Sequence, residues 1–139
     1  MASIIGNQGL QVSGDRTAGI NGPPAAYQAM AWDNATGAGN SFLAAHTKLN
    51  DRAGATLFTA SGMDATFPSR ASQTVSYQGT IPVGTFNGNT IGRVSIHNIA
   101  SGSVSLSSAT LCVGIDQQSI AKTADFALST KTDILYTSV

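Results

Sequence analysis

Alternation of apolar and polar side chains is the strongest signal along this chain, and it is clearest over residues 93–139. Short runs in this stretch place every second side chain on one face, which is the period of a β-strand. The runs cover residues 94–97, 103–106, 110–115 and 126–128. The last run continues in phase and predicts a long final strand, which we interpret as the closing strand of a sheet or small barrel. Its inward residues are expected to be Phe126, Leu128, Ile134 and Tyr136.

Weaker patterns earlier in the chain predict three more strands and one helix. The strands are expected near residues 27–32, 55–60 and 75–81, and the loop at 84–89 is expected to form a hairpin tip. The helix is expected near residues 41–53, with Asn40 or Ser41 as its N-cap. Its buried side is predicted to carry Phe42, Ala45 and Leu49. Its solvated side is predicted to carry Lys48, Asn50, Asp51 and Arg52.

Residues 1–22 are punctuated by glycine and hold one clear alternating pair, Leu10 and Val12. We therefore expect an extended N-terminal arm here, followed by a single β-rich domain over residues 23–139. A length of 139 residues is near the common size of one domain. Several short strands with one early helix favour a mainly β fold, either a sandwich of the jelly-roll kind or a partly open barrel.

Charge is scarce and balanced in this chain. Seven basic and seven acidic residues give no net charge, and the basic residues are scattered along the sequence. Phosphate recognition needs a basic stripe, so nucleic acid is not an expected partner. Only 10% of the residues are charged, whereas most soluble monomers keep apart through surface charge. We expect much of this surface to be covered by neighbouring copies or partners.

Cys112 is the only cysteine, so no disulfide within the chain is expected. It lies in an apolar run, which predicts a buried and unreactive thiol. The start of the chain lacks the basic and apolar regions of a signal peptide. No stretch approaches the roughly 20 apolar residues of a membrane span. We therefore expect no membrane partner and a protein that stays in the cytoplasm unless it leaves with a larger particle.

Catalytic chemistry has little support in the sequence. Nucleophile-elbow, zinc-protease and phosphate-loop motifs are missing, as are cysteine pairs with metal spacing. Asp64 could face Asp116 or Asp125 across a cleft as in a glycosidase, but nothing in the sequence pairs them. His46, His97 and an aspartate could bind a metal, although strand alternation turns His97 away from the core. The prediction is a non-enzymatic protein without a cofactor or a metal.

Aromatic side chains leave a different kind of binding function open. A ring from Tyr27, Trp32, Tyr77 or Phe86 could stack on a sugar, as in a carbohydrate-binding β-module. Only Phe86 lies in an evident loop. This is the weakest of the alternatives.

An ordered series of short motifs runs through residues 27–139. The motifs are Asn40-Ser41-Phe42, Thr47-Lys48-Leu49, Met63-Asp64-Ala65, Phe67-Pro68 with Arg70, Asn98 before Ala100-Ser101-Gly102, and a terminal alternating strand with a Lys-Thr pair. In this order the motifs resemble a group of small virion structural proteins of tailed bacteriophages. The resemblance carries no catalytic residues.

The resemblance implies a head decoration (cement) protein that binds and stabilises the capsid, assembled in the host cytoplasm and located in the virion. A tail, baseplate or fibre-attachment protein is the alternative. The expected partners are the major capsid protein or tail components, together with copies of the chain itself in a homotrimer or other symmetric homo-oligomer. The expected assembly contacts lie in the arm and the final strand: Ile4, Ile5, Leu10, Val12, Tyr136 and Val139.

Overall fold

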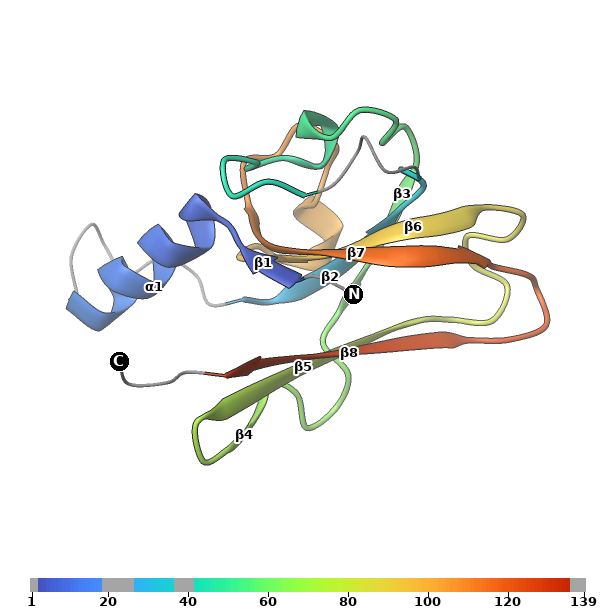
Figure 1. Cartoon of the computed structure of the whole chain (residues 1–139). Helices are drawn as coiled ribbons and strands as arrows, with labels where there is room; N and C mark the ends of the chain where they lie inside the picture. Colours follow the sequence, from blue (N-terminus) through green and yellow to red (C-terminus); the bar gives the residue numbers. More distant parts are fainter. Residues whose placement is uncertain (1–2, 19–26, 37–41, 136–139) are drawn as a thin grey trace.

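Two antiparallel β-sheets packed face to face form the body of the protein (Figure 1). A computed structural model describes residues 3–18, 27–36 and 42–135. Within these residues the five-stranded sheet has the order β1 (Ser3–Ile5), β7 (Leu111–Ala121), β6 (Thr90–His97), β2 (Ala29–Asp33), β3 (Phe58–Gly62). The three-stranded sheet has the order β4 (Ser69–Ala71), β5 (Thr74–Ile81), β8 (Leu128–Leu135). The sheets do not close into a barrel, so the predicted mainly β, sandwich-like fold is confirmed.

The space between the two sheets holds the larger core. Strand alternation supplies it, because Met30 and Trp32 of β2 and Val94 and Ile96 of β6 all point inward. Trp32 also joins the sheets, since its indole Nε1 donates to Thr130 Oγ1 of β8 at 3.0 Å. The core residues are Val12, Tyr27, Met30, Trp32, Tyr77, Ile81, Ile91, Val94, Ile96, Cys112, Val113, Ile115 and Ile134.

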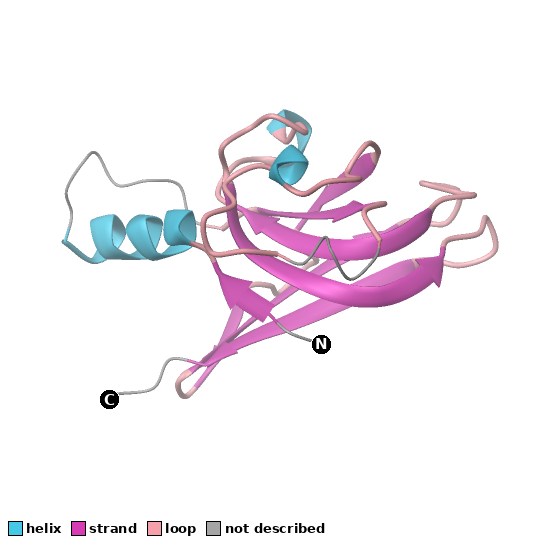
Figure 2. Ribbon diagram, turned by 45° about the horizontal axis from the view of Figure 1, so that its top comes forward, coloured by secondary structure: helices cyan, strands magenta, loops and turns pink. Residues whose placement is uncertain are grey.

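A third layer covers the other face of the five-stranded sheet. It is made of the loops at residues 42–57 and 98–110, which include the 3-10 turns η2 (Leu49–Asp51) and η3 (Ser101–Ser103). Figure 2 shows these loops over one face of the sheet. Phe42 and Leu49 are buried in a second, smaller core under this layer. Strand β6 is therefore buried on both faces from Ile91 to His97.

The predicted extended arm is wrong for the described part of residues 1–22. Strand β1 pairs with β7, and α1 (Asn7–Ala18) follows it against the same strand. Gly9 and Gly14 weaken the helical signal by roughly 1 kcal/mol each relative to alanine. Tertiary packing overrides that weakness, because Val12 is buried in the chain's own core and Tyr27 Oη donates to the Gly9 carbonyl at 3.2 Å.

The α-helix predicted near residues 41–53 is also wrong over its described part, residues 42–53. The segment consists of turns and of η2. Asp51 holds it in this form, since its carboxylate accepts hydrogen bonds from the backbone N–H of Thr47 at 2.8 Å and Lys48 at 3.0 Å. Arg52 was expected on the solvated side but is only 2% exposed, because it reaches Asp33.

Three smaller expectations also fail. Residues 103–106 form no strand, because this segment consists of the end of η3 and the turn that follows it. The loop at 84–89 is not a hairpin tip, because it carries the chain from β5 in one sheet to β6 in the other. Strand β8 lies at a sheet edge instead of closing the sheet. It turns Leu128 and Ile134 inward as predicted, but Phe126, just before it, is 37% exposed.

Candidate functional site

The predicted assembly contacts divide between the chain's own core and its surface. Val12 is 4% exposed in the chain's own core, so the expectation that this side chain meets a neighbouring subunit is corrected. Ile5 is partly buried against the same core, and its contact with a neighbouring subunit stays a prediction. Leu10, on the outer side of α1, is 58% exposed and stays available. The backbone of Ile4 pairs with Gly114 of β7. Tyr136 and Val139 lie outside the described residues.

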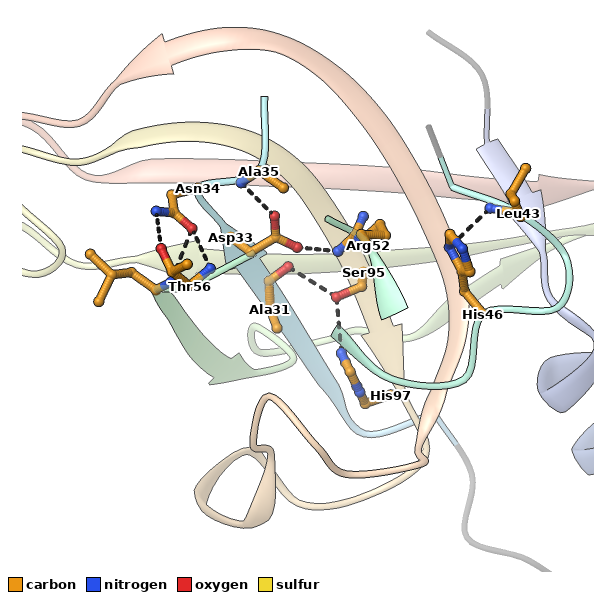
Figure 3. Close-up of polar contacts among 11 residues, drawn as sticks. Ala31, Asp33, Asn34, Ala35, Leu43, His46, Arg52, Thr56, Ser95 and His97 are labelled. Atoms are coloured by element: carbon orange, nitrogen blue, oxygen red, sulfur yellow. Dashed lines mark hydrogen bonds and ion pairs between the residues drawn. The ribbon is translucent and has the colours of Figure 1, made fainter. Parts of the chain in front are cut away.

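A buried polar network lies between β2, β6 and the covering layer (Figure 3). Asp33 Oδ2 and Arg52 Nη2 form an ion pair, and both side chains are fully buried. Asp33 Oδ1 accepts from the backbone N–H of Ala35 at 2.9 Å. Burial raises the pKa of Asp33, whereas the positive charges of Arg52 and Arg93 and the hydrogen bond from Ala35 act against that rise. The pair therefore ties the loop around η2 to the sheet.

His97 belongs to the same buried layer. Its Nε2 is 2.9 Å from Ser95 Oγ and its Nδ1 is 3.0 Å from Thr110 Oγ1. Burial, together with the positive charge of Arg52, lowers the pKa of His97 to about 4. Strand alternation correctly predicted that this ring points away from the larger core, but the covering layer buries it completely. His97 is thus a neutral link between β6 and the loop before β7.

The grouping considered for metal binding does not form among the described side chains. His46 Nδ1 accepts from the backbone N–H of Leu43 at 3.2 Å, while His97 has its own partners under the sheet. Asp64 accepts from Gln78 and Thr80 of β5. No three histidine, cysteine or acidic side chains in the described ranges gather closely enough to hold a metal ion. The side chain of Asp116 is outside the described part.

The aromatic rings considered for sugar stacking are withdrawn from the surface. Tyr27, Trp32 and Tyr77 are at most 8% exposed. Phe86 is partly buried and packs against the larger core. Tyr27, Trp32 and Tyr77 therefore do not offer a stacking platform, and Phe86 exposes only part of its ring.

Cys112 is buried, and burial raises the pKa of its thiol to about 12, in agreement with the predicted buried and unreactive thiol.

Two loops form one end of the sandwich, which we call the tip: residues 82–89 between β5 and β6, and residues 122–127 between β7 and β8. Hydrogen bonds fasten the loops together, from Gly88 N to Lys122 O and from Lys122 N to Asn89 O, both 2.9 Å. Lys122 is only 1% exposed. Its ammonium group donates to the Thr123 carbonyl at 2.7 Å and lies 5.1 Å from the centre of the Phe126 ring. The tip is thus cross-linked internally.

Each of the two loops of the tip carries one exposed large apolar side chain. Ile81 of β5 pairs with Leu128 of β8, so Val83 and Phe126 leave the sheet at the same end. Val83 is 61% exposed and Phe126 is 37% exposed. Sequence reasoning missed the tip, because it treated Phe126 as an inward strand residue. The other exposed large apolar residues among those described are Leu10, Leu43, Leu57 and Leu135.

The edge strand β8 carries one positive and one negative side chain, Lys131 and Asp133, two residues apart. Lys131 and Asp133 lie on its outward face with side chains 52% and 53% exposed, and Lys131 Nζ is 3.5 Å from Asp133 Oδ1. Ser76 Oγ of β5 donates to the same carboxylate oxygen at 2.5 Å. This hydrogen bond and the nearby Lys131 hold the pKa of Asp133 below its ordinary value.

Comparisons of the chain with known proteins gave no match. No protein-family model matches it, and neither the curated proteins nor the solved structures give a match. Among the described residues, no helix has the length and apolar character required to cross a membrane.

Proposed function

We propose that this protein is a non-enzymatic structural subunit of a bacteriophage virion, acting as a head decoration protein that binds and stabilises the capsid as a homo-oligomer. The observation that carries the proposal is the tip, where Val83 and Phe126 stand exposed on two loops that are fastened to each other. A rigid apolar patch suits docking, because little conformational freedom is lost on binding. The motif series over residues 27–139 supplies the virion context.

The low charge of the chain supports the same proposal. The chain has fourteen charged residues among 139, and the seven positive and seven negative charges cancel. Electrostatic repulsion between copies of the protein is therefore weak. A surface of this kind is suited to contact with other protein surfaces through shape and apolar area. The N-terminal segment is not the clamp in this proposal, because β1 and α1 pack on the subunit's own β7.

A rebinding experiment tests the proposal. Particles from a phage deleted for this gene are purified on a density gradient, and the temperature of DNA release is measured with a fluorescent dye. We expect release at a lower temperature than from complete particles, and recovery when the purified protein is added back. Particles that neither bind the added protein nor change their release temperature would contradict the proposal.

Matched variants locate the docking surface in the same assay. Val83→Asp places a charge on the tip and is expected to abolish rebinding, because an unpaired charge would have to be buried. Leu43→Ser is the matched control and is expected to rebind as the unchanged protein does. Leu43 is 58% exposed, and its neighbour Ala44 accepts from the backbone N–H of Asn7, near the end of β7 that is opposite to the tip. A tail or baseplate role remains the second candidate. It would leave DNA release unchanged and instead yield particles defective in tail attachment.

A further inference from the structure

Among the residues that the structure describes, no strand pairs with the outer edge of β8. In the three-stranded sheet β8 comes last, and β5 is the strand that pairs with it among the described residues. The strand is eight residues long, from Leu128 to Leu135. One side of it therefore presents backbone N–H and C=O groups to which another strand can pair. The question is which strand the edge fits.

We propose that the β8 edge pairs with β8 of a second copy, antiparallel and across a two-fold axis at Thr132. In this register Lys131 of each copy lies directly opposite Asp133 of the other, on the outward face of a continuous six-stranded sheet. Opposite charges at facing positions of an antiparallel pair attract. The two-fold axis makes the contact twice, so each of the two charges gains an opposite charge across the strand pair in addition to the one beside it on its own strand.

Thr132 provides a second, independent observation. The residue is 6% exposed, and its Oγ1 is buried without a hydrogen-bond partner among the described residues. A buried hydroxyl without a partner is costly. With the axis at this residue, the Thr132 side chains of the two copies face each other on the inner side of the sheet. Facing threonines in a sheet can hydrogen-bond to each other.

Neighbouring registers fit less well. With the axis at Lys131 the two lysines would face each other, and with the axis at Asp133 the two aspartates would do so. Like charges directly opposite each other oppose pairing. With the axis at Thr130, Lys131 would face Ser129 and neither charge would gain a partner. Charged residues on an edge strand usually discourage pairing, but here their order makes the edge complementary to itself.

This pairing deepens the homo-oligomer of the proposed function and specifies its symmetry. A two-fold contact uses the same surface on both copies and closes as a dimer, which is one of the symmetric homo-oligomers expected besides a homotrimer. One strand pair buries little surface, and interfaces below about 1,200 Å² belong to weak encounters. We therefore expect a dimer that forms at high protein concentration or when copies are held side by side on a particle.

Charge reversal tests the register in purified protein, without any particle. Lys131→Asp leaves two aspartates on the strand and Asp133→Lys leaves two lysines, so each variant alone should self-associate at least about tenfold more weakly than the unchanged protein. An equimolar mixture of the two should form heterodimers, and the double variant K131D/D133K should recover the homodimer. Arg70→Asp, the same charge change at an exposed residue of β4 on the opposite edge of this sheet, should have no effect.

Sedimentation equilibrium at protein concentrations up to about 1 mM, a range suited to weak interfaces, gives the masses, and circular dichroism confirms that each variant is folded. The proposal is overturned if the unchanged protein stays monomeric throughout, if it forms a trimer, if both single variants associate as the unchanged protein does, or if the mixture yields no heterodimer. If any of these outcomes is found and the protein still rebinds to particles, the dimer proposal is wrong and the proposed function stands. If the dimer forms but the protein does not bind particles, the proposed function is wrong and the dimer proposal stands.

Discussion

The ring of Phe42 lies directly on Gly114 of β7, so closely that a Cβ at position 114 would be 2.3 Å from the ring. The same ring has the Arg52 guanidinium 5.9 Å from its centre and the His46 ring edge-on at 5.5 Å. Phe42 is therefore the point at which the covering loops are fastened to the five-stranded sheet. The missing side chain at 114 is what allows the contact.

Gly114→Ala is expected to destabilise the fold by about 2 kcal/mol, because the added methyl group forces the aromatic ring or the strand to move. Gly62→Ala is the matched control, since a Cβ at this glycine of β3 would meet nothing within 4 Å. Its effect should stay within about 0.5 kcal/mol. Urea unfolding of both variants measures the difference. Equal stabilities for the two would show that Phe42 does not rest on Gly114.

Two glycines of α1 should respond to alanine in opposite directions. A Cβ at Gly9 would lie 2.5 Å from the Cys112 carbonyl oxygen, so Gly9→Ala should lower stability by about 1–3 kcal/mol. A Cβ at Gly14 would meet nothing within 4 Å, so Gly14→Ala should raise stability by about 0.5–1 kcal/mol through helix propensity. Thermal unfolding gives both signs. Loss of stability in Gly14→Ala would argue against the helix.

The buried ion pair predicts a large cost when one charge is removed. Arg52→Met leaves Asp33 without the guanidinium that contacts it and should destabilise the fold by about 3–5 kcal/mol. The double variant Arg52→Met with Asp33→Asn should recover part of the loss, because no buried carboxylate remains. Arg70→Met, at an exposed position of β4, is the control and should change little. Additive losses in the double variant would contradict the pairing.

Stability should fall as the solution becomes mildly acidic. The pKa of His97 is lowered in the fold from 6.5 to about 4, so between these values the unfolded chain binds a proton that the folded protein does not. The stabilisation is therefore complete above pH 6.5 and is lost as the pH falls to about 4, by up to about 3 kcal/mol. Urea unfolding at pH 7.0 and pH 4.5 measures it.

Two controls assign that pH dependence to His97. His97→Gln should abolish most of it, whereas His46→Gln should keep it, because these are the two histidines of the chain. Nuclear magnetic resonance of the folded protein gives a readout that does not depend on a stable variant. A His97 ring that titrates with a pKa near 6.5 would contradict the buried, neutral state.

The strands that the sequence predicted best are those with one face against the larger core. Burial on one side enforces alternation, and this holds for β5 and β8. Alternation misled at residues 103–106, where Val104 and Leu106 reach the smaller core from turns. It also left the third layer unseen, because the polar residues Ser95 and His97 on the outer face of β6 read as solvated.

The helix was misplaced for a physical reason that local patterns do not carry. Residues 42–53 have helical spacing, but two of their side chains stabilise a turn conformation instead. Asp51 accepts from the backbone N–H of Thr47, and Arg52 forms an ion pair with Asp33. Residues 7–18 lack a helical signal, yet packing against β7 stabilises them as α1. The Lys131-Thr132-Asp133 pattern is visible in the sequence, but its meaning depends on the position of β8 at an edge, which only the topology provides.

The central claim is that this chain is a building block of a phage particle, and its copy number tests that claim most directly. Quantitative mass spectrometry of gradient-purified particles, calibrated against the major capsid protein, gives the number of copies per particle. The account predicts a number in the same range as that of the capsid protein, as befits a decoration of the whole head. Particles that contain no copy of the chain would contradict the account.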